Sequence, residues 1–370
     1  MAKTWRICVI GSTGRGNYGH ALDTAWLDIP ATRVVAVADD NKSGAASAAR
    51  RLKTDRSYTD WREMLDREKP EIVAICPRWV DRHAEMAIEA ASRGIHVYME
   101  KPFCRNLEEA DAIVAACREG KARLAVAHPT RYSPRLETVR QLIADGAIGE
   151  VLEWRARGKE DRRGGSEDLW VLGTHVLDMI HALAGQPENC YATVTVDGRP
   201  VSRIDVVEGN EGLGPLAGDA IQATYQMPQG AQAIFSSVRN QQGKPSRYGL
   251  RIFGSAGVLE IREAAMAPVR ILQDPSWSPG LSGSNWQTVT TGGIGQPEPL
   301  TGKEHSARHH AAILDLLDAI ENDRRPKGDE LAARDVTEMI MAVFESARTE
   351  TVVPLPLKNR QHPLTQLAER

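Results

Sequence analysis

Short apolar runs alternate with helix-patterned segments along the first third of this 370-residue chain. The apolar runs are residues 5–11 (WRICVIG), 33–40, 71–77, 95–102 and 122–129. Helical periodicity or helix end signals follow at 20–27, 43–52, 84–94 and after Asn106. A continuous apolar run is typical of a strand buried on both faces. Strands separated by helices pair in parallel with right-handed crossovers, so the pattern predicts a doubly wound parallel sheet.

A glycine-rich loop follows the first of these strands and precedes the first predicted helix. The loop reads GSTGRG and places Thr13 where a G-x-G-x-x-G motif has its middle glycine. Glycines in this position let the backbone approach a pyrophosphate, and a threonine hydroxyl can bond a phosphate oxygen. The loop residues expected to contact a dinucleotide are Gly11, Ser12, Thr13, Gly14 and Gly16.

Asp39 ends the second predicted strand, where an acid binds the adenosine ribose in such folds. A carboxylate there accepts bonds from the ribose hydroxyls and repels a 2′-phosphate. The pattern therefore favours NAD over NADP, although the neighbouring Lys42 is compatible with a phosphate. The alternative is that Asp39 only begins a solvated turn.

The second half of the chain has a different pattern, in which strands follow one another without helices. The strand-like runs are 150–157, 190–197, 219–227, 231–239, 248–254 and 257–263. Several alternate apolar and polar residues, as in a sheet with one covered face. Helices are expected at 172–185, 309–322 and 335–348. We therefore predict a Rossmann domain over 1–127 and, over 128–370, an α+β domain with a large, mostly antiparallel open sheet.

Composition narrows the function classes. The formal net charge of −3 gives no electrostatic argument for a nucleic acid or membrane partner, and no apolar stretch reaches the length of a membrane span. The five cysteines show neither CxxC pairs nor metal-ligand spacing, so no metal is expected. Scattered thiols and a first strand that leaves no room for a signal peptide predict a cytoplasmic protein.

An ordered set of motifs resembles the glucose–fructose oxidoreductase/inositol dehydrogenase/MocA (Gfo/Idh/MocA) family. The set comprises the glycine loop, VAVADDN, YMEKPF, TRYSP, LIADGAIGEV, GTHVLD and ESARTETVVPLPL. The resemblance covers almost the whole chain. It implies an oxidoreductase that moves a hydride between a nicotinamide and a sugar or cyclitol carbon. It also implies a homo-oligomer, a dimer or tetramer, associating through the C-terminal sheet.

The resemblance assigns roles to particular residues. Lys101, at the carboxyl end of a parallel strand, would contact the reacting hydroxyl, with Glu100 and Pro77 beside the cofactor. His175 would accept the proton, because imidazole titrates near neutral pH. Asp178, one helical turn later, would orient the histidine or a substrate hydroxyl.

One position departs from the family pattern. Relatives commonly carry an aspartate four residues before this histidine, and this chain has Val171. An apolar side chain can neither relay a proton nor bind a hydroxyl. Asp168 is a candidate replacement, but it lies seven residues before His175.

Further candidates for substrate contacts lie around the expected site. The charged segment GKEDRRGGSEDLW has two interpretations: its arginines recognise an acidic substrate group, or its charges are simply solvated. Trp170 is either an apolar wall of the site or a core residue. The remaining substrate candidates are Arg162, Arg163, His128, Arg131 and Tyr132. The segment 274–299, rich in Gly, Ser and Pro, is a lid, an oligomer contact or a surface loop.

The motifs and the resemblance are consistent with three functions, of which the first is favoured. The first is an NAD-dependent oxidoreductase acting on a secondary hydroxyl of a sugar, sugar derivative or cyclitol. The second is a redox-neutral glycosidase or lyase that oxidises a sugar transiently. The third is a non-catalytic regulator that senses NAD or a sugar.

Overall fold

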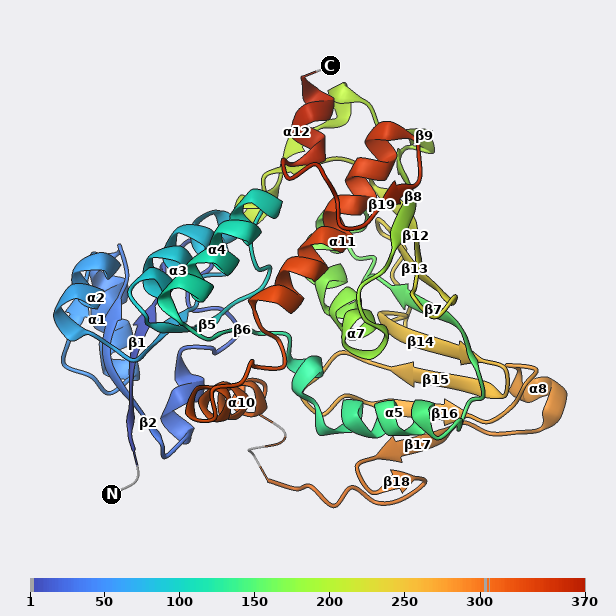
Figure 1. The fold of residues 1–370 in the computed structure, drawn as a ribbon, viewed down its shortest axis with the longest axis horizontal. Helices are drawn as coiled ribbons and strands as arrows, with labels where there is room; N and C mark the ends of the chain where they lie inside the picture. Colours follow the sequence, from blue (N-terminus) through green and yellow to red (C-terminus); the bar gives the residue numbers. More distant parts are fainter. Residues whose placement is uncertain (1–2, 303–304, 306, 370) are drawn as a thin grey trace. The chain divides into compact units, whose positions relative to one another are not determined.

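The computed structural model describes residues 3–302, 305 and 307–369, and this part of the chain forms two compact units (Figure 1). The first unit contains the chain up to Ala127 together with residues 210–214 and 309–334. The second unit contains residues 128–209, 215–308 and the chain from 335 onward. Two segments that the sequence placed in the C-terminal domain thus belong to the first unit.

Within the described residues, the first unit is built on a six-stranded sheet of order β3-β2-β1-β4-β5-β6. The strands are β1 (Trp5–Ile10), β2 (Thr32–Ala38), β3 (Ser57–Tyr58), β4 (Ile72–Ile75), β5 (His96–Met99) and β6 (Leu124–Val126). All of these pairings are parallel, which confirms the predicted doubly wound sheet. The helices and 3-10 turns are η1 (Thr24–Asp28), α1 (Lys42–Arg51), α2 (Trp61–Glu68), η2 (Val80–Arg82), α3 (His83–Ser92), α4 (Leu107–Gly120) and α10 (His310–Glu321).

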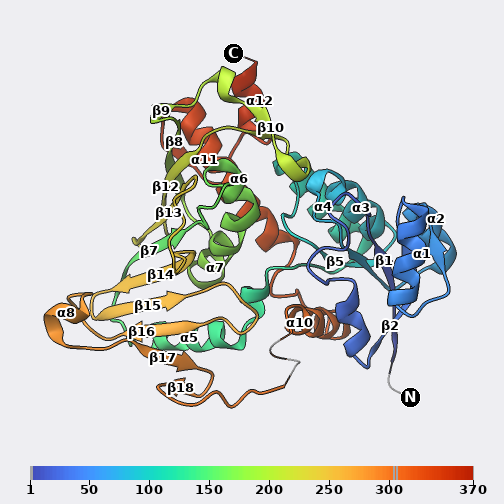
Figure 2. The same ribbon diagram turned by 180° about the vertical axis from the view of Figure 1, so that it is seen from behind.

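Side chains alternate between the two faces of this sheet. Cys8 and Ile10 of β1 share a core with residues of α2, α3 and α4. Figure 2 shows the strands of this sheet and its helices α1 to α4 from behind. Because successive strand residues point to opposite faces, the fully buried Ile7 and Val9 face the other side. Asn106 caps α4 as expected, its side-chain oxygen accepting from the Glu109 N–H at 2.9 Å.

The α-helix predicted over 20–27 is wrong. The chain instead runs through turns from Gly11 and forms only η1 at Thr24–Asp28. Gly19 and Ala21 adopt positive φ angles of 65° and 64°, which interrupt a right-handed helix. Glu100 also binds the backbone N–H of His20 at 2.9 Å and so holds this turn in place. Tertiary contacts therefore override the helical periodicity.

In the described part of the second unit, the main sheet has eleven strands in the order β18-β17-β16-β15-β14-β7-β13-β12-β8-β19, with β9 paired to β8. The strands are β7 (Val151–Arg157), β8 (Asn189–Val196), β9 (Arg199–Pro200), β12 (Ala220–Gln226), β13 (Gln232–Val238), β14 (Gly249–Gly254), β15 (Gly257–Ile261), β16 (Val269–Leu272), β17 (Gln287–Thr290), β18 (Gly293–Ile294) and β19 (Val353–Pro354). A separate pair joins β10 (Val207–Glu208) and β11 (Pro215–Leu216). The β7–β13 pair is parallel and the others are antiparallel, which confirms a mostly antiparallel sheet.

Helices cover one face of this sheet. They are α5 (Pro134–Ala144), α7 (Thr174–Ala184) and α11 (Glu330–Thr349), whose first turn clusters with the first unit. Tyr225 of β12 donates its hydroxyl to the Met339 carbonyl of α11 at 3.0 Å, which fixes helix to sheet. Short helical elements are η3 (Pro129–Tyr132), α6 (Ser166–Asp168), η4 (Leu169–Gly173), η5 (Arg203–Asp205), α8 (Pro279–Ser282) and α12 (Pro363–Ala368), with η6 (Asn210–Gly212) in the first unit.

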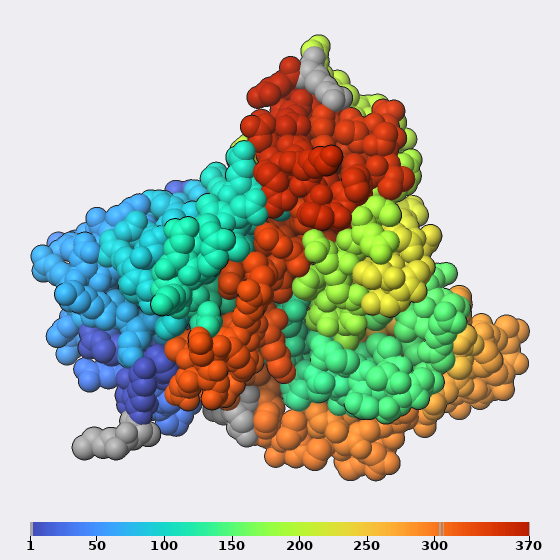
Figure 3. All heavy atoms as spheres, in the orientation of Figure 1, coloured from blue at the N-terminus to red at the C-terminus, as the bar shows by residue number. Residues whose placement is uncertain are grey.

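The segment 274–299 is more regular than its composition indicates. It contains α8 and the strands β17 and β18, which extend one edge of the large sheet. Figure 3 shows this orange segment beside α5, in agreement with the contact between α5 and β17. A sheet-edge extension was not one of the three alternatives that the sequence left open for this segment.

Two further findings concern the described residues. No helix there has both the length and the apolar character needed to cross a bilayer. All five cysteines are buried thiols, and burial raises the pKa of Cys8 to about 12.

Candidate active site

Polar residues of the first unit gather where the parallel strands end. Gly11 follows β1, Asp39 follows β2, Pro77 follows β4, and Glu100 and Lys101 follow β5. Because β2, β1, β4 and β5 are neighbours and run parallel, their carboxyl ends lie along one edge of the sheet. This edge is where doubly wound folds bind their ligands.

The glycine loop is a closed turn with its own hydrogen bonds. Ser12 and Asn17 form an isolated β-bridge, and the Asn17 side chain accepts the Gly14 N–H at 3.0 Å. Gly14 and Gly16 have φ angles of 85° and 84°, which L side chains rarely adopt. The two glycines are therefore required by the turn itself.

Thr13 is the link between this loop and β2. Its hydroxyl donates to Asp39 Oδ2 at 2.6 Å, and its N–H lies 3.1 Å from both carboxylate oxygens. Tyr18 donates its hydroxyl to the same Oδ2 at 2.7 Å, and the Asn41 N–H donates to Oδ1 at 2.9 Å. Burial alone would raise the pKa of Asp39, but the bonds from Thr13, Asn41 and Tyr18 lower it. The ionised Asp39 therefore anchors the loop.

Gly11 is needed because the Tyr18 ring lies directly against it. A Cβ added to Gly11 would lie 2.1 Å from Tyr18 Cε1. No alanine fits there unless the ring moves. The first glycine of the loop thus serves packing within the loop.

A cavity of about 220 Å³ opens beside this loop at the carboxyl ends of β1 and β2. Its lining includes Gly11, Asp39, Asp40, Trp61 and Arg82. The Asp40 side chain is half exposed and lies 3.6 Å from Arg82. The half-exposed Asp40 carboxylate, an aromatic ring and a location at the strand ends match what an adenosine ribose requires, whereas the buried Asp39 uses both of its oxygens within the loop. The residues present therefore fit the adenosine half of a dinucleotide.

Glu100 and Lys101 are both buried at the end of β5. Glu100 accepts hydrogen bonds from the His20 ring at 2.8 Å and from the Lys101 N–H at 3.1 Å. Burial would raise the pKa of Glu100, but the His20 bond and the charges of His20, Lys101 and His309 lower it to about 2. Glu100 thus joins the turn at His20, just after the glycine loop, to the segment that carries Lys101.

His83 connects the loops that follow β4 and β5. Its Nδ1 lies 2.7 Å from the Pro102 carbonyl and its Nε2 lies 2.7 Å from the Pro77 carbonyl, and the side chain is fully buried. The Lys101–Pro102 peptide is cis. His83 therefore fixes the backbone on the carboxyl side of Lys101.

In the second unit, a buried ion pair joins η3 to α7. Arg131 Nε donates to Asp178 Oδ1 at 2.8 Å, and His128 Nδ1 lies 3.3 Å from the same oxygen. His128 Nε2 lies 3.0 Å from the Thr174 hydroxyl oxygen. Asp178 was expected to orient His175 or a substrate hydroxyl, whereas the contacts found for it go to Arg131 and His128. These contacts hold the start of α7 against the chain after β6.

His175 lies at the start of α7, directly after the π-helical turn η4. Such turns often occur at functional sites. The His175 side chain is 3% exposed, and its ring meets the His128 ring edge-on with centroids 5.4 Å apart. Glu263, just after β15, places Oε1 3.9 Å from His175 Nδ1. The sequence did not single out Glu263.

The other predicted substrate residues are placed as follows. Trp170 is 1% exposed and stacks with His362, which puts it in the core of the second unit. Arg163 pairs with Asp161 at 2.6 Å, and Arg162 is exposed. Tyr132 is buried in η3.

Asp168, the candidate replacement for the aspartate missing at Val171, is bound through Oδ2, and its Oδ1 is buried without a hydrogen-bond partner. Its Oδ2 accepts from the Ser237 hydroxyl at 2.6 Å and from the Glu160 N–H at 3.0 Å. These bonds tie the segment before α7 to β13. Asp168 is therefore committed to the sheet side of this segment.

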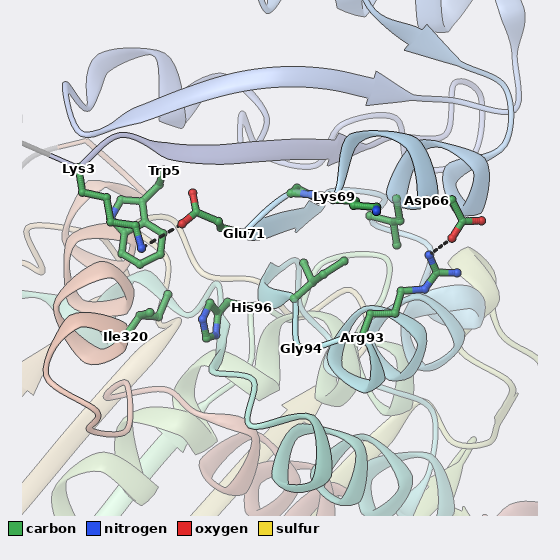
Figure 4. Close-up of a pocket in the computed structure, with 12 residues that line it drawn as sticks. Lys3, Trp5, Asp66, Lys69, Glu71, Arg93, Gly94, His96 and Ile320 are labelled. Carbon is green, nitrogen blue, oxygen red and sulfur yellow. Dashed lines mark hydrogen bonds and ion pairs between the residues drawn. The ribbon is translucent and has the colours of Figure 1, made fainter.

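A second hollow lies at the opposite, amino-terminal edge of the parallel sheet (Figure 4). It measures about 480 Å³, and Trp5, Glu71 and His96 mark the starts of β1, β4 and β5 in its wall. Lys3 pairs with Glu71 at 2.9 Å and lies over the Trp5 ring. Since dinucleotides bind at the carboxyl edge, this hollow is not the cofactor site.

Two family models match most of the chain. The model described as "Oxidoreductase family, NAD-binding Rossmann fold" matches residues 5–128, and that of the GFO/IDH/MocA C-terminal domain matches residues 136–260. The chain belongs to the Gfo/Idh/MocA oxidoreductase family. This confirms the resemblance drawn from the motifs, the oxidoreductase class and NAD as the cofactor.

Several named relatives of this Gfo/Idh/MocA protein are sugar dehydrogenases, and one is named as a 2,7-anhydro-N-acetylneuraminate hydratase. Levoglucosan dehydrogenase of Pseudarthrobacter phenanthrenivorans is 30% identical over 282 residues, 67% of this chain and 72% of the relative. D-glucoside 3-dehydrogenase of Escherichia coli is 23% identical over 372 residues, 95% of this chain and 97% of the relative. A solved structure of levoglucosan dehydrogenase with NADH and levoglucosan superposes with a TM-score of 0.77 at 24% identity, covering 96% of this chain and all of that one. This structural likeness shows the shared fold.

Among the described residues, no cluster of three or more His, Cys, Asp or Glu side chains has the geometry of a metal site. The sequence missed three residues that organise the candidate site, Tyr18, His83 and Glu263. Glu263 follows the end of β15 by two residues, which is a local signal, whereas Tyr18 and His83 each lie eight residues beyond the end of a strand and have no such signal.

The Arg131–Asp178 pair predicts acid sensitivity of the second unit. Burial would raise the pKa of Asp178, but the charges of Arg131 and His128 lower it from 3.8 to about 2. Because the folded pKa is the lower one, the ionised carboxylate stabilises the fold above the ordinary pKa. This contribution, on the order of 2 kcal/mol, is lost as the pH falls from the ordinary pKa towards the folded one.

Urea unfolding near neutral pH and at about pH 3 checks this expectation. Asp178→Asn should destabilise the protein by about 3 kcal/mol at neutral pH, because it leaves Arg131 buried beside a neutral amide. The variant should also lose less stability than the wild type on acidification. The exposed Asp197→Asn is the matched control. An Asp178→Asn variant with unchanged acid sensitivity would refute this account.

Proposed function

We propose that this protein oxidises a secondary hydroxyl of a sugar or sugar derivative with NAD. The observation that carries the proposal is the buried Lys101, held beside Glu100 at the carboxyl edge of the NAD-binding sheet. The printed names of the relatives, levoglucosan, D-apiose and D-glucoside 3-dehydrogenases, support a sugar substrate. A cyclitol is the related alternative.

The roles of the residues follow from the chemistry of alcohol oxidation. Bound NAD supplies the hydride acceptor. The Lys101 ammonium donates a hydrogen bond to the substrate oxygen and stabilises the negative charge that develops on it. His175 takes the hydroxyl proton at its imidazole, so that the O–H and C–H bonds are replaced by a carbonyl. Arg162 and Tyr132 remain candidates for contacts with the rest of the sugar.

The acidic residues after β2 support NAD rather than NADP in this role. Asp39 and Asp40 both line the cavity beside the glycine loop. Two carboxylates disfavour a 2′-phosphate electrostatically. We propose that Asp40 and Asp39 together set this preference.

The open face of the large sheet supports an oligomer. Tyr191 of β8 is 48% exposed and Leu152 of β7 is 41% exposed. Exposed apolar side chains on a broad sheet favour association with another copy of the chain. We infer a dimer or tetramer through this face, whose mass light scattering would report.

The test is an assay of purified protein with NAD and a panel of pyranoses, anhydrosugars and cyclitols. We expect NADH absorbance to rise with at least one sugar. A redox-neutral enzyme would instead release aglycone from a nitrophenyl glycoside in an NAD-dependent manner without accumulating NADH. An inert protein that binds NAD and a protein partner would indicate a regulator. Either of these last two results would overturn the proposal.

A further inference from the structure

Glu263 faces the imidazole of His175. Its Oε1 lies 3.9 Å from His175 Nδ1 and 3.1 Å from Arg308 Nη2. Its side chain is 15% exposed, so that solvent screens these contacts only in part. Glu263 follows β15, a strand of the large sheet. It therefore belongs to a different element from α7, the helix that carries His175.

We propose that Glu263 is the positioning carboxylate of His175. This rests on the proposed function, in which His175 accepts the proton. At 3.9 Å, Glu263 makes no hydrogen bond to Nδ1 in this structure, but its negative charge favours a proton on that nitrogen and leaves Nε2 as the acceptor. It also stabilises the imidazolium that forms when Nε2 takes the hydroxyl proton.

The other carboxylates near α7 have different partners. Asp168 accepts from Ser237, and Asp178 is paired with Arg131. Val171, on the turn before His175, is apolar and cannot serve. Glu263 is the acid with a carboxylate oxygen at ion-pair distance from His175 Nδ1, although it lies far away in the sequence.

Three neighbours affect the charge of this pair. The Arg308 guanidinium lies 3.1 Å from Glu263, and its positive charge opposes a proton on His175. The His128 ring packs edge-on against His175, and its own Nδ1 faces Asp178. Burial raises the pKa of Tyr248, and the charge of Glu263 raises it further, so that Tyr248 stays neutral. Among these neighbours, Glu263 carries the negative charge that favours the protonated form of His175, and the buried Asp178 carboxylate on the next turn of α7 acts in the same direction.

The first test compares Glu263→Gln with the wild type. Glu263→Gln should lower kcat roughly tenfold with little change in KM, because the amide cannot stabilise the imidazolium. The acidic limb of the pH profile should move about one unit lower, because a neighbouring negative charge raises the pH at which His175 deprotonates. Glu263→Asp should restore part of the rate. The control is Glu260→Gln on β15, which removes an acid paired with Arg251 and Arg262 and should match the wild type.

The second test does not require a substrate. NMR titration of the His175 ring signals, assigned with His175→Gln, reports its protonation directly. The midpoint should fall by about one pH unit in Glu263→Gln and stay unchanged in Glu260→Gln. An unchanged midpoint in Glu263→Gln overturns this inference even if the enzyme oxidises sugars. A shifted midpoint in a protein without dehydrogenase activity supports the pairing and rejects the proposed function alone.

Discussion

Replacing Lys101 by methionine is expected to lower sugar-dependent NADH formation at least about a thousandfold. Methionine keeps a similar length and apolar stem but has no ammonium to donate to the substrate oxygen. Because the Lys101 side chain is buried at the end of β5, water cannot replace the lost ammonium as a hydrogen-bond donor to the substrate. Steady-state kinetics with the best sugar of the panel measures the loss.

NAD binding separates a chemical defect from a structural one. Isothermal titration should give a Kd for NAD within a few-fold of the wild type, because Glu100 keeps its bonds to His20 and the glycine loop keeps its bonds to Asp39. Lys121→Met removes an exposed lysine of the same unit and should leave both rate and Kd unchanged. Turnover retained in Lys101→Met would reject the assignment of Lys101.

The second large effect is expected for Asp39→Asn. Several donors converge on this carboxylate from Thr13, Tyr18 and Asn41, and an amide turns its own N–H groups towards some of them. A lost charge-assisted bond costs about 1.5–3 kcal/mol, so that we expect the melting temperature to fall by several degrees. The Kd for NAD should rise at least about tenfold, because the loop beside the adenosine cavity loses its anchor.

Matched variants make this prediction specific. Asp55→Asn changes an exposed acid of the same unit and should leave the melting temperature and the Kd near the wild type. Thr13→Gly restores the common glycine spacing yet should weaken the loop, since it removes the 2.6 Å bond to Asp39. A Thr13→Gly protein with tighter NAD binding and unchanged stability would show that the loop does not depend on this link.

Local patterns predicted most of the fold. Each buried strand of the first unit was visible as an apolar run, and the order of strands and helices gave the parallel sheet. The crossover after β1 was missed because its conformation depends on Glu100, which lies about eighty residues away and binds His20. The periodicity of residues 20–27 carries no trace of that contact. The strand β3 and the helix α2 were also missed, because such short elements contribute little to the apolar periodicity of the sequence.

The candidate site was predicted in part. Lys101 and Glu100 could be placed because a strand end is a local feature. The partners of Asp178 and Asp39 could not, since His128, Arg131 and Tyr18 reach them only through the tertiary fold. Glu263 illustrates the same limit, because only the register of β15 against its neighbours brings it near His175.

A crystal structure with NADH and an oxidisable sugar tests the central claim most directly. The account predicts that Lys101 Nζ and His175 Nε2 both lie within hydrogen-bond distance of one hydroxyl, whose carbon faces the nicotinamide. A well-ordered nicotinamide and sugar with either side chain directed elsewhere would contradict it.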